Sequence, residues 1–435
     1  MEEIDRINKI QGVITAGNSV GSKRIIYKGD KKDLTAYAIP VEALIFNQYN
    51  GRIGTWVKTY EKLNGTTIDA ATEEGEKTII DFLWKSKIER NKKTMEDIED
   101  KGQLEVGIVT KDGVVIDGNR RSMLLKKIDE KNNDAPTYFR AVVLEDKLID
   151  NPKEIRKLET IYQLGADAPV DYNAIEKYLK CKELFEEDHF TAKEIGKMMG
   201  ETETRILEYL SILGLMERFL KNYGYEGIYT YLDEIKAEGP FVDLNNYMER
   251  YRNKPGTIKG RNWTPDKDDL DDLESVYFDY IRAGFGTHKI RCIGNPKSGK
   301  GFFNTKAVWE QFFDEYKKRI EPVNNDEPSL EVLRRKRPNE NATDLIKGRD
   351  KDWKSKGCDN YKTLEGNLHH NIKASQGSLD DIVDEAGPLN YLTRAHNALL
   401  QIDIENPAFE GDEVRELVYK INNLTYKFKK HPKLK

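Results

Sequence analysis

A change of pattern near residue 150 constrains the fold of this 435-residue sequence more than any other feature. Before it, short β-type runs alternate with helical segments. Residues 106–110 and 114–116 flank a Lys-Asp-Gly turn and predict a hairpin, and residues 138–144 predict a further strand. From residue 151 onward, apolar residues recur at helical spacing. We therefore predict an α+β protein, with a small α/β domain followed by an all-helical domain and a mostly helical C-terminal region.

The helical half contains a compact pair of helices between residues 191 and 214. The first is expected to begin at Thr191, with Glu194 completing a capping box, and to end at Gly200. The second begins after Glu201, and its apolar positions recur along one face: Ile206, Leu207, Leu210 and Leu213. Residues 153–163 and 171–186 predict two helices upstream. The pattern thus predicts two short helices joined by a tight turn, preceded by further helices.

Four residues at the junction of a predicted strand and a predicted helix form the clearest candidate site. Gly118 is followed by Asn119, Arg120 and Arg121. Backbone N–H groups at the start of a helix bind anions, and two arginines add charged, bidentate donors. Phosphate is the ligand that such a turn suits best. The alternative is that Gly118 only turns the chain and the arginines form surface ion pairs.

This turn is one of several motifs that resemble the ParB/sulfiredoxin superfamily. Residues 102–103 and 115–124 are similar to the region around the Gly-Glu-Arg-Arg motif of ParB-like N-terminal domains. The other motifs follow in the family's order: an opening strand at 39–44, an arginine-bearing loop at 50–52, a Glu-Asn-x-Gln-Arg-like stretch at 159–163, a helix start at 171–176 and a ParB/KorB-type helix-turn-helix at 191–215. The resemblance covers about residues 36–220.

The resemblance implies a pocket for a nucleoside triphosphate, CTP or ATP, together with Mg²⁺. By motif, the residues that would bind the nucleotide are Arg52, Gly118, Asn119, Arg120, Arg121 and Gln163. Glu159 would place the metal or a water molecule, and would be the catalytic residue in a slow NTPase. The resemblance identifies no metal ligand set.

Three positions depart from the family pattern. Asn119 replaces the glutamate of the motif, Thr160 replaces an asparagine and Leu164 replaces an arginine. The first change removes a carboxylate that could lie near magnesium. These departures weigh against metal binding and a preference for CTP. They leave open a third possibility, a binding scaffold whose pocket is vestigial.

The helix-turn-helix points to DNA as a partner, because the second helix of this motif lies in the major groove with its N-terminal residues near the bases. The candidate DNA-binding residues are Thr202, Thr204, Arg205 and Tyr209. Three glutamates on the same element would repel phosphate. The alternative is therefore a helix-turn-helix that serves packing or protein contacts.

Overall charge argues neither for nor against nucleic acid, since 71 basic and 76 acidic side chains give a net charge of −5. Phosphate contacts would have to come from local basic clusters, each of which could equally be a solvated face: residues 254–261, 288–300, 334–337 and 427–433. The three cysteines lie far apart, which fits a reducing compartment. No apolar run approaches the roughly 18 residues of a membrane span. We expect a cytoplasmic protein.

Two other patterns invite an enzymatic interpretation. Residues 294–300 have the GxxxxGK spacing of a P-loop after a β-like run, but Gly301 replaces the Ser or Thr that binds magnesium. We predict a basic loop there instead. Residues 266–274 hold six acidic side chains, which would supply metal ligands in a nuclease. Solvated surface is the competing interpretation.

The sequence divides into six predicted segments: an N-terminal arm (1–35), a nucleotide-binding domain (36–148), a helix-turn-helix domain (149–222), a mixed or helical region without an assigned role (223–320), a polar linker (321–377) and a helical hairpin with a basic tail (378–435). The preferred function is nucleotide-regulated DNA binding by a homodimer, with the C-terminal helices as a surface for a protein partner. The alternative is an NTPase or metal-dependent nuclease of a mobile-element or phage-defence system.

Overall fold

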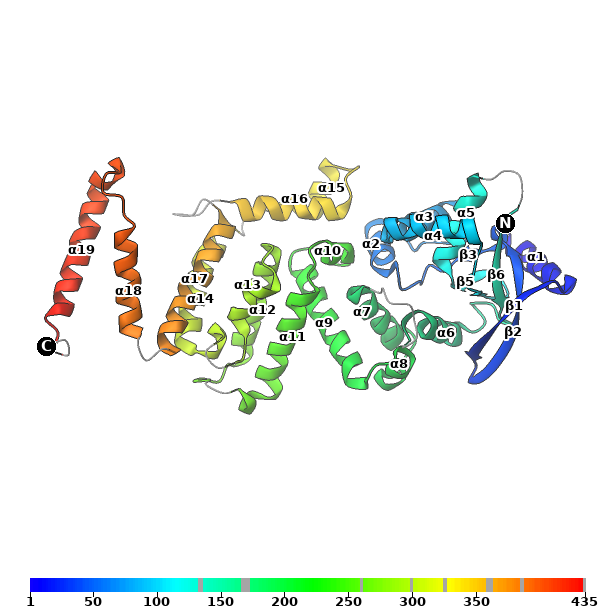
Figure 1. Cartoon of the computed structure of the whole chain (residues 1–435), viewed down its shortest axis with the longest axis horizontal. Helices are drawn as coiled ribbons and strands as arrows, with labels where there is room; N and C mark the ends of the chain where they lie inside the picture. The colour runs from blue at the N-terminus through cyan, green and yellow to red at the C-terminus, as the bar shows by residue number, and fades with distance from the viewer. Residues whose placement is uncertain are drawn as a thin grey trace.

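The computed structural model describes residues 1–131, 136–165, 173–258, 261–297, 300–323, 327–356, 363–383 and 387–432. It is an α+β protein, as predicted, with a six-stranded sheet near the N-terminus followed by helices (Figure 1). The strands are β1 (Ser19–Tyr27), β2 (Asp30–Pro40), β3 (Ile45–Phe46), β4 (Gly107–Val109), β5 (Val114–Asp117) and β6 (Tyr138–Val143), in the order β1-β2-β6-β4-β5-β3. Strands β4 and β5 pair antiparallel, which confirms the predicted hairpin.

The N-terminal segment is built into the sheet and is not the arm that we predicted. Helix α1 (Glu3–Ala16) precedes β1 and β2, which pair antiparallel, and β2 continues the sheet by pairing with β6. Ile25 and Tyr27 are buried while Ile26 between them is exposed. This alternation lets one face of β1 pack on the core, and that burial holds the segment in place.

The helices of the sheet region fix the turn that follows β5. They are η1 (Val41–Ala43), α2 (Gly54–Asn64), α3 (Glu73–Ser86), α4 (Ile88–Lys101) and α5 (Asn119–Lys131). Helix α5 packs on β5 and β6 and contacts α3 and α4, whereas α1 lies beyond β1 and β2 in Figure 1. Val115, Met123 and Phe139 are fully buried between these elements. The Gly118 turn is therefore held by the core on both sides.

The predicted helix pair is present and joins a longer helical region. The helices are α6 (Pro152–Leu164), α7 (Ala174–Lys182), the π-helical turn η2 (Glu183–Glu187), α8 (Ala192–Met199) and α9 (Glu203–Asn222). Thr191 and Glu194 form the predicted capping box, and Gly200 ends α8 in the left-handed region with φ 69°. Helix α9 continues past Gly214 to Asn222, because Met216 and Phe219 extend its buried face. Residues 171–172 of the predicted helix start lie outside the described residues.

The segment predicted to be a polar linker contains helices packed on the rest of the chain. Beyond α9 the elements are α10 (Tyr229–Glu234), α11 (Glu238–Asn253), η3 (Pro255–Thr257), α12 (Lys267–Arg282), α13 (Thr287–Gly294), η4 (Phe302–Asn304), α14 (Lys306–Ile320), α15 (Leu330–Lys336), α16 (Ala342–Ser355), α17 (Leu364–Val383), α18 (Gly387–Leu400), η5 (Pro407–Glu410) and α19 (Asp412–Lys429). Few residues between 321 and 377 are apolar, but Leu345, Ile346 and Trp353 are fully buried. Because apolar residues are few in this segment, its sequence did not reveal that it contributes side chains to the core.

A buried ionic network anchors α16 to the helices before it. Asp350 accepts hydrogen bonds from Tyr225, at 2.6 Å, and from Tyr231, and it pairs with Arg282 at 2.6 Å. Arg282 also donates to Glu327 at 2.8 Å and lies over the ring of Trp353 at 4.2 Å. These buried polar side chains thus have hydrogen-bond or ion-pair partners inside the fold. Such partners lower the free-energy cost of burying them.

The two patterns that suggested an enzyme lie at helices in the structure. Residues 287–294 form helix α13, so no strand precedes the P-loop-like spacing, and positions 298–299 lie outside the described residues. In the acidic stretch, Asp266 and Asp269 form the capping box of α12, and Glu274 pairs with Arg218 at 2.7 Å. Among the described residues, no group of three or more His, Cys, Asp or Glu side chains is arranged to hold a metal ion.

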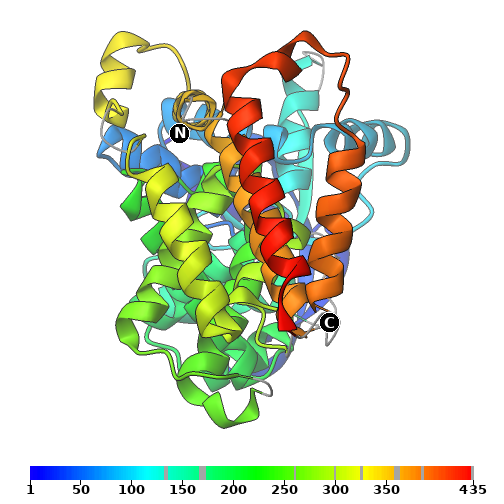
Figure 2. The ribbon, with the colours of Figure 1, turned by 90° about the vertical axis from the view of Figure 1, so that its left-hand side faces the viewer.

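The C-terminal helices α18 and α19 follow α17 at the end of the chain. Helix α18 contacts α17, and both views place α18 and α19 side by side at the end opposite the sheet (Figures 1 and 2). Of the 25 large apolar side chains that are exposed among the described residues, 13 lie between Leu389 and Phe428. Among the helices that the structure describes, none combines the length and apolarity needed to span a bilayer.

Candidate functional site

The turn between β5 and α5 requires glycine at position 118. Gly118 has φ +102°, and a Cβ atom there would lie 2.7 Å from the ring of Phe139. It would also lie 3.2 Å from a terminal nitrogen of Arg121. Other residues rarely adopt such a φ, and the ring of Phe139 belongs to the core. The turn therefore has both a backbone and a packing reason for its glycine.

Asn119 and Gln163 use their amides to hold this region together. The side-chain oxygen of Asn119 accepts a hydrogen bond from the N–H of Asn47 at 3.0 Å, and its nitrogen donates to the Val115 carbonyl at 2.8 Å. Gln163 on α6 donates to the Ile116 carbonyl at 3.1 Å. Both side chains are buried. The asparagine that replaces the motif's glutamate thus ties the loop after β3 to β5.

The two arginines of the turn have different surroundings. Arg121 donates to the Glu105 carbonyl at 2.6 Å and pairs with Asp117 at 3.3 Å. Asp117 also pairs with Lys23 at 2.8 Å. Arg120 instead lines a cavity, and Arg52 lines the same cavity. The structure therefore brings together two of the predicted nucleotide-binding residues and places Arg121 within an ion-pair group on the sheet.

Glu159 lies in a buried ion pair between α6 and α7. One of its oxygens is 3.3 Å from the Nζ atom of Lys180, which also lies 3.2 Å from Glu183. Burial raises the pKa of the Glu159 carboxyl, and the ammonium group of Lys180 opposes this shift. The catalytic role of Glu159 stays a prediction. In any such role, the carboxylate would act next to the ammonium group of Lys180.

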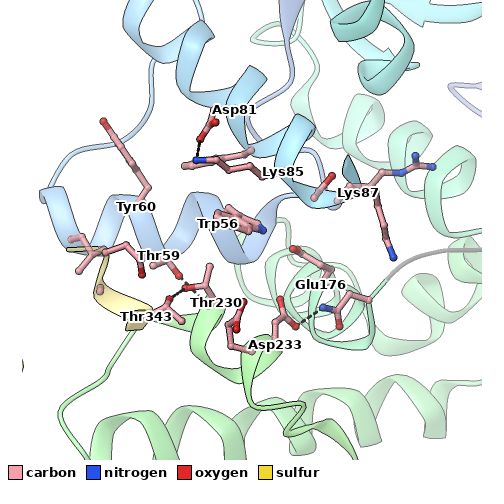
Figure 3. Close-up of a pocket in the computed structure, with 18 of the residues that line it drawn as sticks. Trp56, Thr59, Tyr60, Asp81, Lys85, Lys87, Glu176, Thr230, Asp233 and Thr343 are labelled. Atoms are coloured by element: carbon pink, nitrogen blue, oxygen red, sulfur yellow. Dashed lines mark hydrogen bonds and ion pairs between the residues drawn. The ribbon is translucent and has the colours of Figure 1, made fainter. Parts of the chain in front are cut away.

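The cavity lies where the sheet region meets the helices, and its volume is about 520 Å³, within the usual range for small-ligand sites. Helix α2 forms one wall, with the α3–α4 junction above it, and α7, α10 and the start of α16 close the other side (Figure 3). Its cations among the described residues are Arg52, Lys85, Lys87 and Arg120. Lys85 is paired with Asp81 at 2.7 Å. Arg52, Lys87 and Arg120 also line the cavity and bring positive charge to it.

Two carboxylates on the cavity wall join the helical region to α2. Glu176 on α7 accepts hydrogen bonds from the N–H of Thr55 at 3.1 Å and from its hydroxyl at 2.7 Å, and so caps the start of α2. Burial raises the pKa of Glu176 to about 8. Burial also raises the pKa of Asp233 on α10 to about 6, against the lowering effect of its hydrogen bond from Asn173. Because both carboxyl groups line the cavity, a charged ligand there would change the pKa of each.

The helix-turn-helix presents three of its four predicted DNA-binding residues. Thr202 caps α9 by accepting a hydrogen bond from the Arg205 N–H at 3.2 Å, and Thr204 is exposed. The guanidinium of Arg205 is exposed, pairs with Glu208 at 2.7 Å and lies over the ring of Tyr209 at 5.0 Å.

Tyr209 is not part of the exposed surface, contrary to our prediction. It is 5% exposed, its ring lies 4.9 Å from that of Tyr178, and its hydroxyl donates to Glu201 at 3.0 Å. Position 209 follows Ile206 by three residues and therefore shares its inner face. Leu207, which we placed on the apolar face, directly follows Ile206 and so points in another direction; it is 50% exposed.

The sequence did not reveal most of the cavity wall. Trp56 and Tyr60 on α2, Asp233 on α10 and Thr343 on α16 were not predicted, because they come from helices that meet only in the folded chain. Glu176 lies in the helix start that resembles the family's motif, and this was the one signal available for it.

Among solved structures, the chain is similar to the C-terminally truncated chromosome-partitioning protein ParB from Caulobacter crescentus complexed to the centromeric parS site, with 13% identity and a TM-score of 0.27. The match covers 46% of this chain and 87% of that chain. No family model and no curated protein matches the sequence. A likeness this loose does not establish a family, so the function has to be inferred from the site.

Proposed function

We propose that the protein binds DNA through α8 and α9 and that a nucleoside triphosphate in the α2 cavity, CTP or ATP with Mg²⁺, sets its DNA affinity. One observation carries the proposal: Arg52 and Arg120, which come from motifs far apart in the sequence, line one cavity whose other wall belongs to the helical region. Guanidinium groups are well suited to phosphate, because they remain charged and donate two hydrogen bonds at once.

A magnesium ion in such a site needs few ligands from the protein. It is usually held by the phosphates and one or two carboxylates, and it keeps several waters. Asp81 and Asp233 line the same cavity and fit that requirement. When bound, the ion would neutralise part of the phosphate charge. The protein's own part is to orient the nucleotide between its two walls.

Helix α7 connects the cavity to the DNA-binding helices through three consecutive residues. Glu176 caps α2 at the cavity wall. Lys177 pairs with Glu201 in the turn between α8 and α9 at 3.1 Å. The ring of Tyr178 packs 4.9 Å from that of Tyr209 on α9. A nucleotide that shifts α2 relative to α7 would therefore also shift the helix-turn-helix. Such a shift would couple the two sites, because the nucleotide would make different contacts in the two arrangements.

The C-terminal helices supply a surface for a second copy of the chain. On α19, five apolar residues follow a spacing of three and four: Val414, Leu417, Ile421, Leu424 and Phe428. This is the seam pattern of a coiled coil. Contiguous apolar surface of this kind marks an interface, and pairing of two such helices would give the homodimer. Loss of the dimer in a Leu417→Asp/Leu424→Asp variant, measured by sedimentation, would support this assignment, and an unchanged mass would refute it.

The proposal is tested by measuring DNA affinity with and without nucleotide. Fluorescence anisotropy of a mixed duplex is recorded with no ligand and with each of CTP, ATP and GTP plus magnesium, for the wild type and for Arg120→Ala. The matched control is Arg24→Ala, which removes the same charge from an exposed pair with Asp33 on the hairpin. We expect one nucleotide to change the DNA affinity of the wild type and the control, but not that of Arg120→Ala. Unchanged affinity with every nucleotide would leave a binding scaffold with a vestigial pocket.

A further inference from the structure

The cavity extends along α2, and its character changes from one end to the other. Arg52 precedes the helix, Trp56 lies in its first turn and Tyr60 lies one turn later. Residues four apart lie on one face of a helix, so Trp56 and Tyr60 line the cavity together. Figure 3 shows Lys87 at one end, Tyr60 and Thr343 at the other, and Trp56 between them. At 1.5 Å per residue, Trp56 and Tyr60 are offset along the helix axis by roughly 6 Å.

The aromatic end has a rigid platform. Trp56 and Tyr60 are half-buried, and both pack on the buried Phe82 of α3, with ring centroids 5.7 Å and 6.1 Å apart. Phe82 fixes the two rings, while both side chains still contribute to the cavity wall. A fixed aromatic ring that borders a cavity offers a face on which a planar heterocycle can stack.

The wall that faces this platform carries hydroxyl groups from distant segments. Thr230 on α10 and Thr343 on α16 are joined by a hydrogen bond of 2.7 Å between their hydroxyl oxygens, and both line the cavity. Hydroxyls can donate and accept, so they suit the edge of a heterocycle. The cations Arg52, Lys87 and Arg120 line the same cavity, and Lys87 marks the end away from Tyr60 in Figure 3.

We propose that the cavity holds its nucleotide with the base stacked on Trp56 and Tyr60, opposite Thr230 and Thr343, and with the phosphates toward Arg52, Lys87 and Arg120. This inference rests on the proposed function and adds a requirement to it: the ligand needs its aromatic base, and inorganic triphosphate cannot replace it. The alternative role for Trp56 and Tyr60, as core contacts of Phe82, accounts for their inner faces but not for the surface that borders the cavity.

The test compares ligands with and without a base. Calorimetric titrations with CTP, ATP, GTP and inorganic triphosphate, each with magnesium, are made on the wild type and on Trp56→Leu. The matched control is Trp84→Leu, because Trp84 is another half-buried tryptophan, on α3, that lies beneath Lys127 and does not line the cavity. Trp56→Phe keeps a ring at position 56, and thermal melting of every variant checks that it is folded.

We expect the preferred nucleotide to bind at least tenfold more tightly than triphosphate, as stacking of one base predicts. Trp56→Leu should lose about tenfold in nucleotide affinity and little in triphosphate affinity, whereas Trp56→Phe and Trp84→Leu should stay near the wild type. Equal affinity for nucleotide and triphosphate, or an unchanged affinity in folded Trp56→Leu, would overturn the stacking proposal while the nucleotide-binding function stands. Binding of no nucleotide at all would overturn both.

Discussion

The Gly118 turn and the α2 cavity lie close together, yet their polar residues have different surroundings. In the turn, the amides of Asn119 and Gln163 are hydrogen bonded to backbone groups, and Arg121 is paired on the sheet. In the cavity, Arg120 and Arg52 border open space next to two aromatic rings. Residues of one short motif can therefore differ in role: some hydrogen bond within the fold, and others line a cavity.

The largest effect is expected from Asn119→Ala. The substitution removes two buried hydrogen bonds and leaves the N–H of Asn47 and the carbonyl of Val115 without these partners. We expect a loss of about 3 kcal/mol in the free energy of unfolding. Urea denaturation measures it, with Arg24→Ala as the comparison that should remain near wild-type stability, because its ion pair with Asp33 is exposed. A stable Asn119→Ala protein that fails to bind nucleotide would place Asn119 with the ligand-facing residues instead.

A smaller effect separates the two adjacent arginines. Arg120→Ala should weaken nucleotide binding by about 2 kcal/mol, the range for a hydrogen bond to a charged group. Arg121→Ala should weaken it much less, since Arg121 does not line the cavity and pairs with Asp117 on the sheet. Calorimetric titration of both variants makes the comparison. A larger loss in Arg121→Ala would show that the turn, and not the cavity, receives the phosphates.

The third effect concerns pH and the carboxylate that joins the two walls. Burial raises the pKa of Glu176 from its ordinary value of 4.5 to about 8, so the folded state holds this proton more tightly than the unfolded chain. Its contribution to stability is full below the lower value and is lost as the pH rises toward the higher one. We expect a decline on the order of 2 kcal/mol between pH 5 and 8.

The matched variant for this decline is Glu176→Gln, which keeps an acceptor for Thr55 but cannot ionise. Its stability should vary less over the same pH range, with a residual slope from Asp233, whose pKa burial raises to about 6, and from Glu159, whose pKa burial also raises. Thermal unfolding across the pH range measures both proteins. Identical pH profiles would mean that Glu176 is not the group responsible.

The sequence predicted the elements whose patterns are local. The β4–β5 hairpin, the capped α8 and the position of Gly118 follow from turn residues and periodicity. The strand pairing of the N-terminal segment was missed because only the end of β1 alternates clearly between buried and exposed residues. The helices between 321 and 377 were missed because their burial depends on Asp350 and a few apolar residues that meet distant partners.

The candidate site was predicted in part for the same reason. Arg52 and Arg120 lie in short motifs, which can be recognised from neighbouring residues in the sequence. Trp56, Tyr60 and Thr343 carry no such pattern, since α2 and α16 are brought together only by tertiary packing. A sequence can thus name the residues of a turn, but the wall of a cavity between regions is visible only after folding.

The coupling through α7 is tested most directly by asking whether nucleotide and DNA affinities depend on each other. The dissociation constant for a duplex is measured with and without saturating nucleotide, and the constant for the nucleotide with and without saturating duplex. If the cavity is coupled to the helix-turn-helix through α7, both constants must change by the same factor, which we expect to be roughly 5- to 150-fold. Tight binding of both ligands with no mutual effect would contradict coupling between the cavity and the helix-turn-helix.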